Sequence, residues 1–123
     1  MIIIDYNDKR PIYEQIIDRF QTLIINGALE ANMQLPSVRS LAIELAINAN
    51  TIQRAYSELE REGYIYSVKG RGNFVRDDKS LADRQHRKLL QDLKQQLQAC
   101  KTFGISPEEI QSCLQEIYME VTE

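Results

Sequence analysis

Two groups of side chains in the middle of the chain have the chemistry to recognise a nucleic acid. The first is a polar stripe containing Asn50 and Gln53, on a segment whose apolar residues recur every three or four positions. A side-chain amide presents a donor and an acceptor together and can pair with the edge of adenine through both. The second group is Lys69-Gly70-Arg71, two cations around a glycine that can take positive φ and approach another molecule closely. We expect base contacts from the first group and phosphate contacts from the second.

The elements that must position these groups predict a winged helix-turn-helix. Ser37 and Asn48 are suitable N-caps for two short helices, with residues 46–48 as the turn between them. The apolar residues of the second helix fall on one face: Ile52, Ala55, Tyr56 and Leu59. Residues 64–68 and 73–75 have strand character and flank the cationic tip, which makes them a hairpin or wing.

Two further elements are expected before the two short helices. Residues 2–4 are three isoleucines and predict a short edge strand. Pro11 suits the first position of a helix, and Asn26-Gly27 can close that helix with a left-handed cap. Its apolar residues recur at helical spacing: Ile12, Ile16, Phe20, Leu23 and Ile24. We therefore expect a mainly α fold with a small β wing, and we assign residues 1–76 to one DNA-binding domain.

The composition changes after Arg76, where residues 77–80 form a polar hinge. We expect a long helix over residues 81–103 that ends at Gly104, and a last helix that begins at Ser106 with a capping box. Each of these helices has one apolar face, formed by Leu90, Leu93, Leu97 and Cys100 on the first and by Ile110, Leu114, Ile117 and Val121 on the second. A hairpin of about 45 residues is too small to bury both faces alone, so it needs the first domain or a second copy as a partner. We assign residues 77–123 to a two-helix C-terminal dimerisation hairpin.

Bulk composition argues against several other functions. The 123 residues carry a net charge of −3, which argues against nucleic-acid binding. The argument is weak, because charges are screened over about 8–10 Å and net charge does not describe a local surface. No apolar run approaches the ~20 residues that cross a bilayer, and the N-terminus is too soon acidic for a signal peptide, so we expect a cytoplasmic protein without a membrane partner. His86 has no second histidine to share a metal, and Cys100 and Cys113 are better interpreted as small core side chains than as a redox pair. Without an acid–base constellation or a phosphate loop, we expect neither an enzyme nor a cofactor.

A longer pattern runs through five segments of the chain: Pro11-Ile12-Tyr13-Glu14-Gln15-Ile16, Leu35-Pro36-Ser37-Val38-Arg39, Asn50-Thr51-Ile52, Leu59-Glu60-Arg61-Glu62-Gly63 and Gly70-Arg71-Gly72-Asn73-Phe74-Val75. In unbroken order they resemble the GntR family of bacterial transcription regulators. Asn48-x-Asn50-Thr51 with Ala55-Tyr56, followed by a brief two-helix tail, resembles the YtrA-type subgroup. Larger relatives add a ligand-binding or enzyme-like domain, for which we expect no room here.

The resemblance implies a set of DNA contacts, transferred position by position: Arg39 on the second helix, Asn50, Thr51 and Gln53 on the third, and Lys69-Gly70 at a wing tip that reaches the minor groove. Ala49 stands where many relatives have an arginine that reads guanine, so we expect no such contact here. Ala46 stands where a turn glycine is common and is expected to be slightly strained, whereas Asn32 tolerates the left-handed region.

Positive charge adds Arg54, Arg71 and Arg76 as candidates for phosphate contacts. An alternative stays open for two arginines of the third helix. Arg54 and Arg61 could instead pair with acidic residues of the same helix: Glu58, Glu60 or Glu62.

These features predict a sequence-specific transcriptional regulator, most simply a repressor. Three or four base contacts per subunit, at about 1–3 kcal/mol each, cannot specify a genomic site, so we expect a homodimer on an inverted-repeat operator. The subgroup resemblance implies control of a transporter operon. The alternative is a winged helix that contacts another protein and has no DNA function. No residue identifies a small-molecule effector; if one exists, we expect it at the dimer interface or between the two domains.

Overall fold

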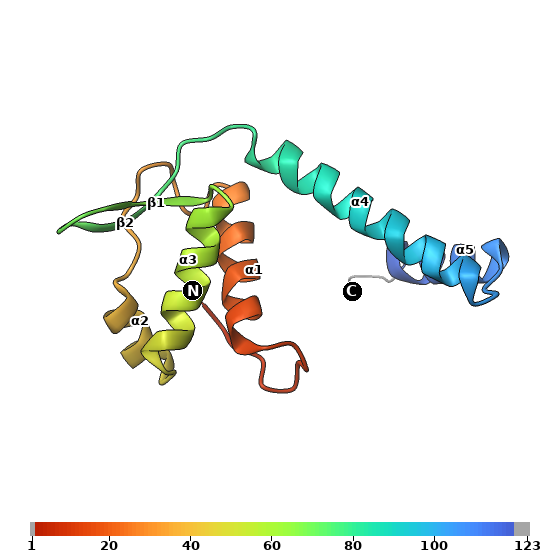
Figure 1. The fold of residues 1–123 in the computed structure, drawn as a ribbon, viewed down its shortest axis with the longest axis horizontal. Coiled ribbons are helices and arrows are strands. Elements are labelled where there is room, and N and C mark those ends of the chain that lie inside the picture. The colour runs from red at the N-terminus through yellow and green to blue at the C-terminus, as the bar shows by residue number, and fades with distance from the viewer. Residues whose placement is uncertain (1, 120–123) are drawn as a thin grey trace. The chain divides into compact units, whose positions relative to one another are not determined.

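The computed structural model describes residues 2–119, within which it contains five helices and one two-stranded antiparallel sheet (Figure 1). In chain order the elements are α1 (Ile12–Ile25), α2 (Val38–Leu45), α3 (Ala49–Arg61), β1 (Ile65–Val68), β2 (Gly72–Val75), α4 (Leu81–Thr102) and α5 (Pro107–Tyr118). They form two compact units that meet between Ala82 and Asp83, in the first turn of α4. The predicted fold class is confirmed as a winged helix-turn-helix followed by two helices. Val121, which we expected on the last apolar face, lies outside the described residues.

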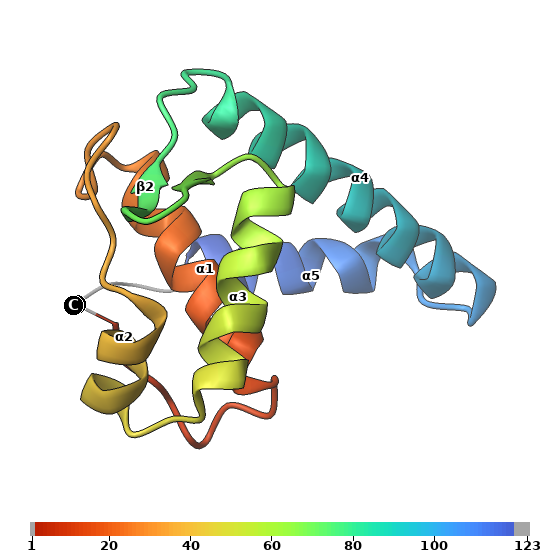
Figure 2. The same cartoon turned by 60° about the vertical axis from the view of Figure 1, so that its left-hand side comes forward.

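The core of the first unit lies between α1 and α3, which pack against each other, while α2 and β1 pack on α3. Figure 2 shows the three helices beside the hairpin of β1 and β2. The helical face predicted for α3 is the buried one, because Ile52, Ala55, Tyr56 and Leu59 are at most 1% exposed. The other large, fully buried side chains come from every neighbouring element: Ile16, Phe20, Leu41, Ile65 and Val75.

Tyr56 ties three segments of this core together. Its ring meets Phe20 of α1 edge-on, with the ring centroids 5.6 Å apart and the planes at 84°. Its hydroxyl donates to the Pro36 carbonyl oxygen at 2.7 Å, just before α2 begins. Burial, reinforced by the negative charge of Glu44, raises the pKa of Tyr56 and keeps the phenol protonated. The single hydroxyl of this buried ring is thus satisfied while it fixes α3 against α1 and α2.

Both predicted N-caps around the helix-turn-helix are confirmed. Ser37 Oγ accepts a hydrogen bond from the Ser40 N–H at 3.0 Å, and Asn48 Oδ1 accepts one from the Asn50 N–H at 2.8 Å. Between them, Ala46 adopts φ 56° and ψ 45°. This left-handed conformation costs an L-residue about 1–2 kcal/mol, so the strain expected at this turn is present in the backbone. The turn sets the angle between α2 and α3.

The prediction of an edge strand at residues 2–4 is wrong, because these residues belong to no strand. The free edge of β2 is already covered by the connector before α2, since the backbone of residues 32–35 pairs with that of residues 73–75. The N-terminal segment instead lies along α1, where the buried Gln15 amide accepts from the Asp5 N–H at 2.9 Å and donates to the Asp5 carbonyl at 3.1 Å. The Gln15 side chain therefore anchors the end of this segment to α1 through the backbone of Asp5.

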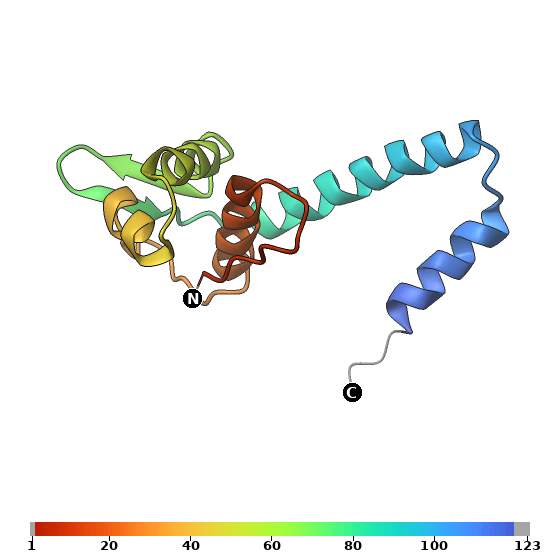
Figure 3. The same ribbon diagram turned by 90° about the horizontal axis from the view of Figure 1, so that it is seen from below.

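The second unit contains most of α4 and all of α5. Gly104, at φ 82°, follows α4, and Ser106 begins α5 with the predicted capping box, in which Ser106 and Glu109 each accept a backbone hydrogen bond from the other at 3.1 Å. The two helices diverge from this turn (Figure 3), and none of residues 83–119 is buried. Among the described residues, no helix combines the length and the apolar character that spanning a membrane requires.

Candidate nucleic-acid interface

The outer face of α3 presents the predicted amide side chains to solvent. Asn50 and Gln53 are exposed, and Thr51 is half-buried beside them. Because Asn48 caps the helix through the backbone N–H of Asn50, the Asn50 side-chain amide is not used by the cap. Gln53 Nε2 donates to Ser57 Oγ at 3.1 Å, one turn later on the same face. This bond orients the Gln53 amide and leaves its carbonyl oxygen available to accept a hydrogen bond.

Arg39 lies in the first turn of α2, two residues after the N-cap Ser37, and its side chain is exposed. It takes part in none of the ion pairs found among residues 2–119. Ala49 is exposed at the first position of α3, where its methyl group offers no hydrogen-bond donor. The structure therefore places an unpaired arginine, Arg39, at the start of α2 and no arginine at the first position of α3.

The tip of the wing holds the predicted cations on a backbone that requires glycine. Lys69 and Arg71 are exposed on either side of Gly70, which has φ 79°. Gly72 has φ 123°, and a β-carbon there would lie 3.0 Å from Gln34 Nε2. That same Gln34 nitrogen donates to the Arg71 carbonyl oxygen at 2.7 Å and so ties the tip to the connector before α2. Figures 1 and 3 both show the tip projecting beyond the helices of its unit.

The base of the wing is held by aromatic side chains on one face of the hairpin. Tyr66 of β1 is paired with Phe74 of β2, and their rings stack with centroids 5.6 Å apart and planes at 21°. The Tyr66 hydroxyl donates to Asn32 Oδ1 at 2.9 Å, and Asn32 itself adopts the left-handed conformation at φ 67°. Arg76 adds a cation to this cluster, with its guanidinium carbon 5.9 Å from the Tyr66 ring centroid. These contacts give the tip a rigid support.

Arg54 and Arg61, the two arginines of α3 that could pair with its acidic residues, behave differently. Arg61 pairs with Glu58, with its Nε donating to a carboxylate oxygen at 3.0 Å, and this bond raises the pKa of Arg61. Arg54 makes no ion pair within residues 2–119. Its guanidinium carbon instead lies 3.7 Å from the ring centroid of Tyr13 in α1. The pairing alternative therefore holds for Arg61 and does not hold for Arg54.

Two residues that position this surface were not foreseen: Gln34 behind the wing tip and Tyr13 beneath Arg54. Both act on residues far from them in the sequence, across an interface that no local pattern describes. The only local signal is that Tyr13 belongs to the Pro11–Ile16 segment and Gln34 directly precedes the Leu35–Arg39 segment.

The geometry has a counterpart among known proteins. The family model described as bacterial regulatory proteins, gntR family, matches residues 12–75, from the first residue of α1 to the last of β2. The chain belongs to the GntR family. The match covers every candidate contact residue of the helix-turn-helix and the wing except Arg76, which directly follows it.

Individual relatives extend the similarity along this GntR chain. It is 36% identical over 123 residues to the HTH-type transcriptional repressor YtrA of Bacillus subtilis (strain 168), covering 98% of this chain and 95% of that protein. Its fold matches a GntR family transcriptional regulator from Listeria monocytogenes with a TM-score of 0.69 and 36% identity, covering 90% of this chain and 98% of that one. The DNA-binding domain of AraR in complex with operator ORE1 matches with a TM-score of 0.52 and 25% identity, over 61% of this chain and 92% of that one. The GntR chain is a transcription regulator, and not an enzyme.

The apolar face expected on the last two helices of the GntR chain is largely open to solvent. Leu90, Leu93, Leu114 and Ile117 are between 50% and 68% exposed, and only Leu97 and Ile110 are half-buried. The two helices diverge from their turn (Figure 3), and the exposure of these side chains shows that neither helix fully covers the apolar face of the other. Large apolar side chains this exposed in a run along two helices are typical of a surface that another chain covers.

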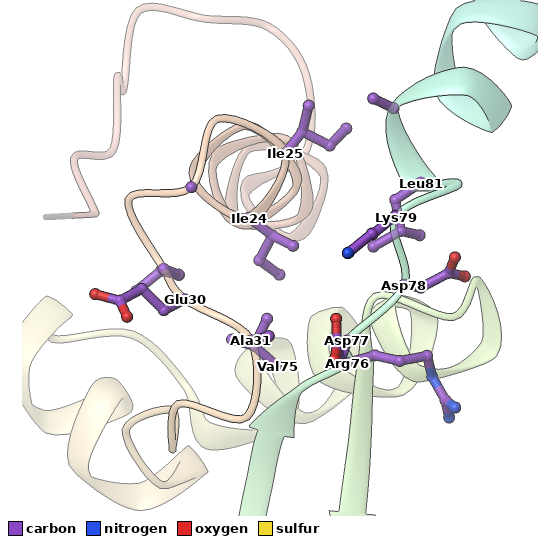
Figure 4. Close-up of a pocket in the computed structure, with 13 residues that line it drawn as sticks. Ile24, Ile25, Glu30, Ala31, Val75, Arg76, Asp77, Asp78, Lys79 and Leu81 are labelled. Atoms are coloured by element: carbon purple, nitrogen blue, oxygen red, sulfur yellow. The ribbon is translucent and has the colours of Figure 1, made fainter.

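A hollow of about 360 Å³ lies within the first unit, where the chain leaves β2 and enters α4 (Figure 4). This volume is at the lower end of the ~300–1,000 Å³ that small-molecule sites occupy. Ile24 and Leu81 line its apolar part, and the Lys79 ammonium group extends toward Ile24 in Figure 4. Asp77 and Lys79 are exposed at its rim, so the hollow is open to solvent and is part of the hinge. Among the described residues, no three side chains form a group that could hold a metal ion.

Proposed function

We propose that this GntR-family regulator is a cytoplasmic repressor that binds an inverted-repeat operator in double-stranded DNA as a homodimer. The observation that carries the proposal is the exposed amide face of α3, which has cations of α2 and of the wing beside it in one packed unit. Similarity over nearly the whole chain to a protein named as a transcriptional repressor supports repression over activation. A relative solved with its operator supports DNA as the partner over the protein-contact alternative.

Within each subunit we assign base reading to α3 and phosphate binding to the residues around it. Asn50 and Gln53 suit adenine, and Ala49 or the Thr51 methyl group suits a thymine methyl. The groups for phosphate contacts are Arg39, Arg54, Lys69, Gly70 and Arg71, together with Arg76 at the base of the wing. Lys69 and Gly70 would reach the minor groove, because a glycine tip lets the backbone approach closely.

Dimerisation is assigned to the open apolar face of residues 77–123, which we treat as one functional region beside the DNA-binding residues 1–76. Its contact residues would be Leu90, Leu93, Leu97, Ile110, Leu114 and Ile117. A second copy would bury the leucines that one copy leaves half-exposed, and it would set the distance between two reading helices. Control of a transporter operon is the further expectation from the subgroup resemblance.

The test is a mobility-shift assay with full-length protein on the upstream region of its own gene, with a mixed-sequence duplex of equal length as competitor. We expect selective retardation of the upstream fragment, and lower expression of a reporter placed behind it when the protein is present. Equal affinity for both duplexes would overturn sequence-specific binding, and higher reporter expression would overturn repression.

Three variants separate the assigned roles in the same assay. Asn50→Ala and Gln53→Ala should each reduce the preference for the upstream fragment by about 1–3 kcal/mol, because each removes base contacts. Lys69→Ala should weaken binding to both duplexes alike and flatten the salt dependence. Arg61→Ala is the matched control, since this arginine pairs with Glu58 and should leave both affinities unchanged. If Gln53→Ala leaves the preference intact, the base-reading assignment is wrong.

A further inference from the structure

The contact between Arg54 and Tyr13 joins the reading helix to the first turn of α1. The guanidinium carbon lies 3.7 Å from the ring centroid, which places the cation on the face of the ring. Tyr13 is half-buried, so its ring is held by the surrounding packing, while Arg54 is exposed. One face of the Arg54 guanidinium therefore packs on the Tyr13 ring, while the side chain stays accessible to solvent.

This support leaves the binding capacity of the arginine intact. A cation–π contact uses the face of the guanidinium, whereas its five N–H donors point outward in the plane of the group. Arg54 has no ion-pair partner within residues 2–119, in contrast to Arg61, whose donors are occupied by Glu58. A planar fork of free donors matches the geometry of a phosphate group.

The position of Arg54 on α3 places this fork beside the amide face. Arg54 follows Asn50 by four residues and is therefore its neighbour on the helix surface. Its side chain lies on the flank that faces α1, since Tyr13 belongs to that helix. Figures 1 and 3 show α2 and the wing tip on the opposite side of α3.

We propose that Tyr13 is a positioning residue that holds Arg54 ready to bind a DNA phosphate on the α1 flank of the reading helix. The inference rests on the proposed DNA-binding function and adds a contact on the side opposite to Arg39 and the wing. A free arginine loses much rotamer freedom when it binds, and the stacked one has lost part of that freedom before DNA arrives. Phosphates on both sides of α3 would then fix its register on the duplex.

The experiment measures the affinity of the full-length protein for a mixed-sequence DNA duplex across a range of salt concentrations, because phosphate contacts do not depend on sequence. Arg54→Ala should reduce the slope of log affinity against log salt by about 0.9 for each subunit bound. Tyr13→Leu should weaken binding about two- to five-fold per subunit, whereas Tyr13→Phe keeps the ring face and should bind like the wild type. Arg61→Ala, an arginine of the same helix with an ion-pair partner, is the control and should change neither affinity nor slope.

Tyr13 and Arg54 should also act as one unit, so that Tyr13→Leu causes no further loss once Arg54 is alanine. An unchanged slope for Arg54→Ala, or full additivity of the two changes, would overturn the inference. If Tyr13→Leu fails to fold, Arg54→Lys decides instead: it keeps the charge but not the planar fork, and wild-type affinity for it would overturn the positioning role. A wild-type protein that binds neither this duplex nor the upstream fragment would overturn the proposed function itself.

Discussion

The two units of this chain have the same helical spacing of apolar residues, but only the first unit buries its apolar faces. Every buried apolar residue among residues 2–119 lies between Ile2 and Leu81, and none of residues 83–119 is buried. In the first unit, α1, α2 and the hairpin surround α3 and give each apolar face a partner. In the second, α4 and α5 diverge and their leucines stay half-exposed. The difference shows that spacing predicts where an apolar face lies, and that the neighbouring elements decide whether one copy can bury it.

This contrast has a thermodynamic consequence. Burying a leucine stabilises a fold by about 1.5–3 kcal/mol, and the first unit obtains that stabilisation within one chain. If a second copy covers the open face of the second unit, that unit obtains this stabilisation only on association, so its stability should depend on protein concentration. The effect of a substitution in the first unit should therefore be independent of protein concentration. The effect of a substitution in the second unit should depend on it.

The largest effect is expected from Leu59→Ala in the fully buried face of α3. Removing this side chain leaves a cavity and should lower the free energy of unfolding of the first unit by about 2–5 kcal/mol. Urea denaturation at two protein concentrations measures the loss, which should be the same at both. A loss that shrinks as the concentration rises would mean that the first unit is not self-sufficient.

The next effect is expected from Leu93→Ala, which is 51% exposed in one copy. If a second copy covers this face, the change should raise the dissociation constant for self-association about ten-fold or more, as measured by analytical ultracentrifugation. Gln95→Ala is the matched control, because Gln95 is exposed on the other side of α4. A monomeric wild-type protein at micromolar concentration would contradict the assignment of this face to dimerisation.

Ala46→Gly should have a smaller effect of the opposite sign. Glycine relieves the left-handed conformation at φ 56° but adds freedom to the unfolded chain, so we expect a net gain of about 0.5–1 kcal/mol in the first unit. Thermal denaturation measures this gain, and the constant for self-association should stay the same. A lower melting temperature would mean that this turn is not strained.

The most local effect is expected from Gln34→Ala, which removes the bond to the Arg71 carbonyl at 2.7 Å. A hydrogen bond of this kind is worth about 0.5–1.5 kcal/mol, and its loss should loosen the wing tip more than the unit as a whole. Amide hydrogen exchange should accelerate at Arg71, while the helices keep their protection. Unchanged exchange at the tip would show that Gln34 does not hold it.

The features that could be predicted from the sequence are those encoded within a few residues. The caps at Ser37, Asn48 and Ser106 and the buried face of α3 each depend on positions two to four apart, and all are present. The features that escaped prediction are contacts between distant segments. Residues 2–4 form no strand because the connector before α2 already covers the hairpin edge, and no local pattern shows which segment will reach that edge first.

The candidate site divides in the same way. The exposed amides and the cationic tip follow from helical and hairpin periodicity, so their positions were predictable from the sequence. The support beneath them was not, because the Gln34–Arg71 and Tyr13–Arg54 contacts depend on how separate elements pack. The roles of all these residues on DNA stay predictions.

We propose that each chain supplies one DNA-reading helix and that the open face of α4 and α5 joins two chains into the dimer that binds the operator. Selection of duplexes bound by the full-length protein from a random pool tests this claim directly. We expect an inverted repeat whose half-sites are separated by about one helical turn or a multiple of it, since two symmetric reading helices enter the same side of the duplex. Enrichment of a single, unrepeated motif, or no enrichment at all, would contradict it.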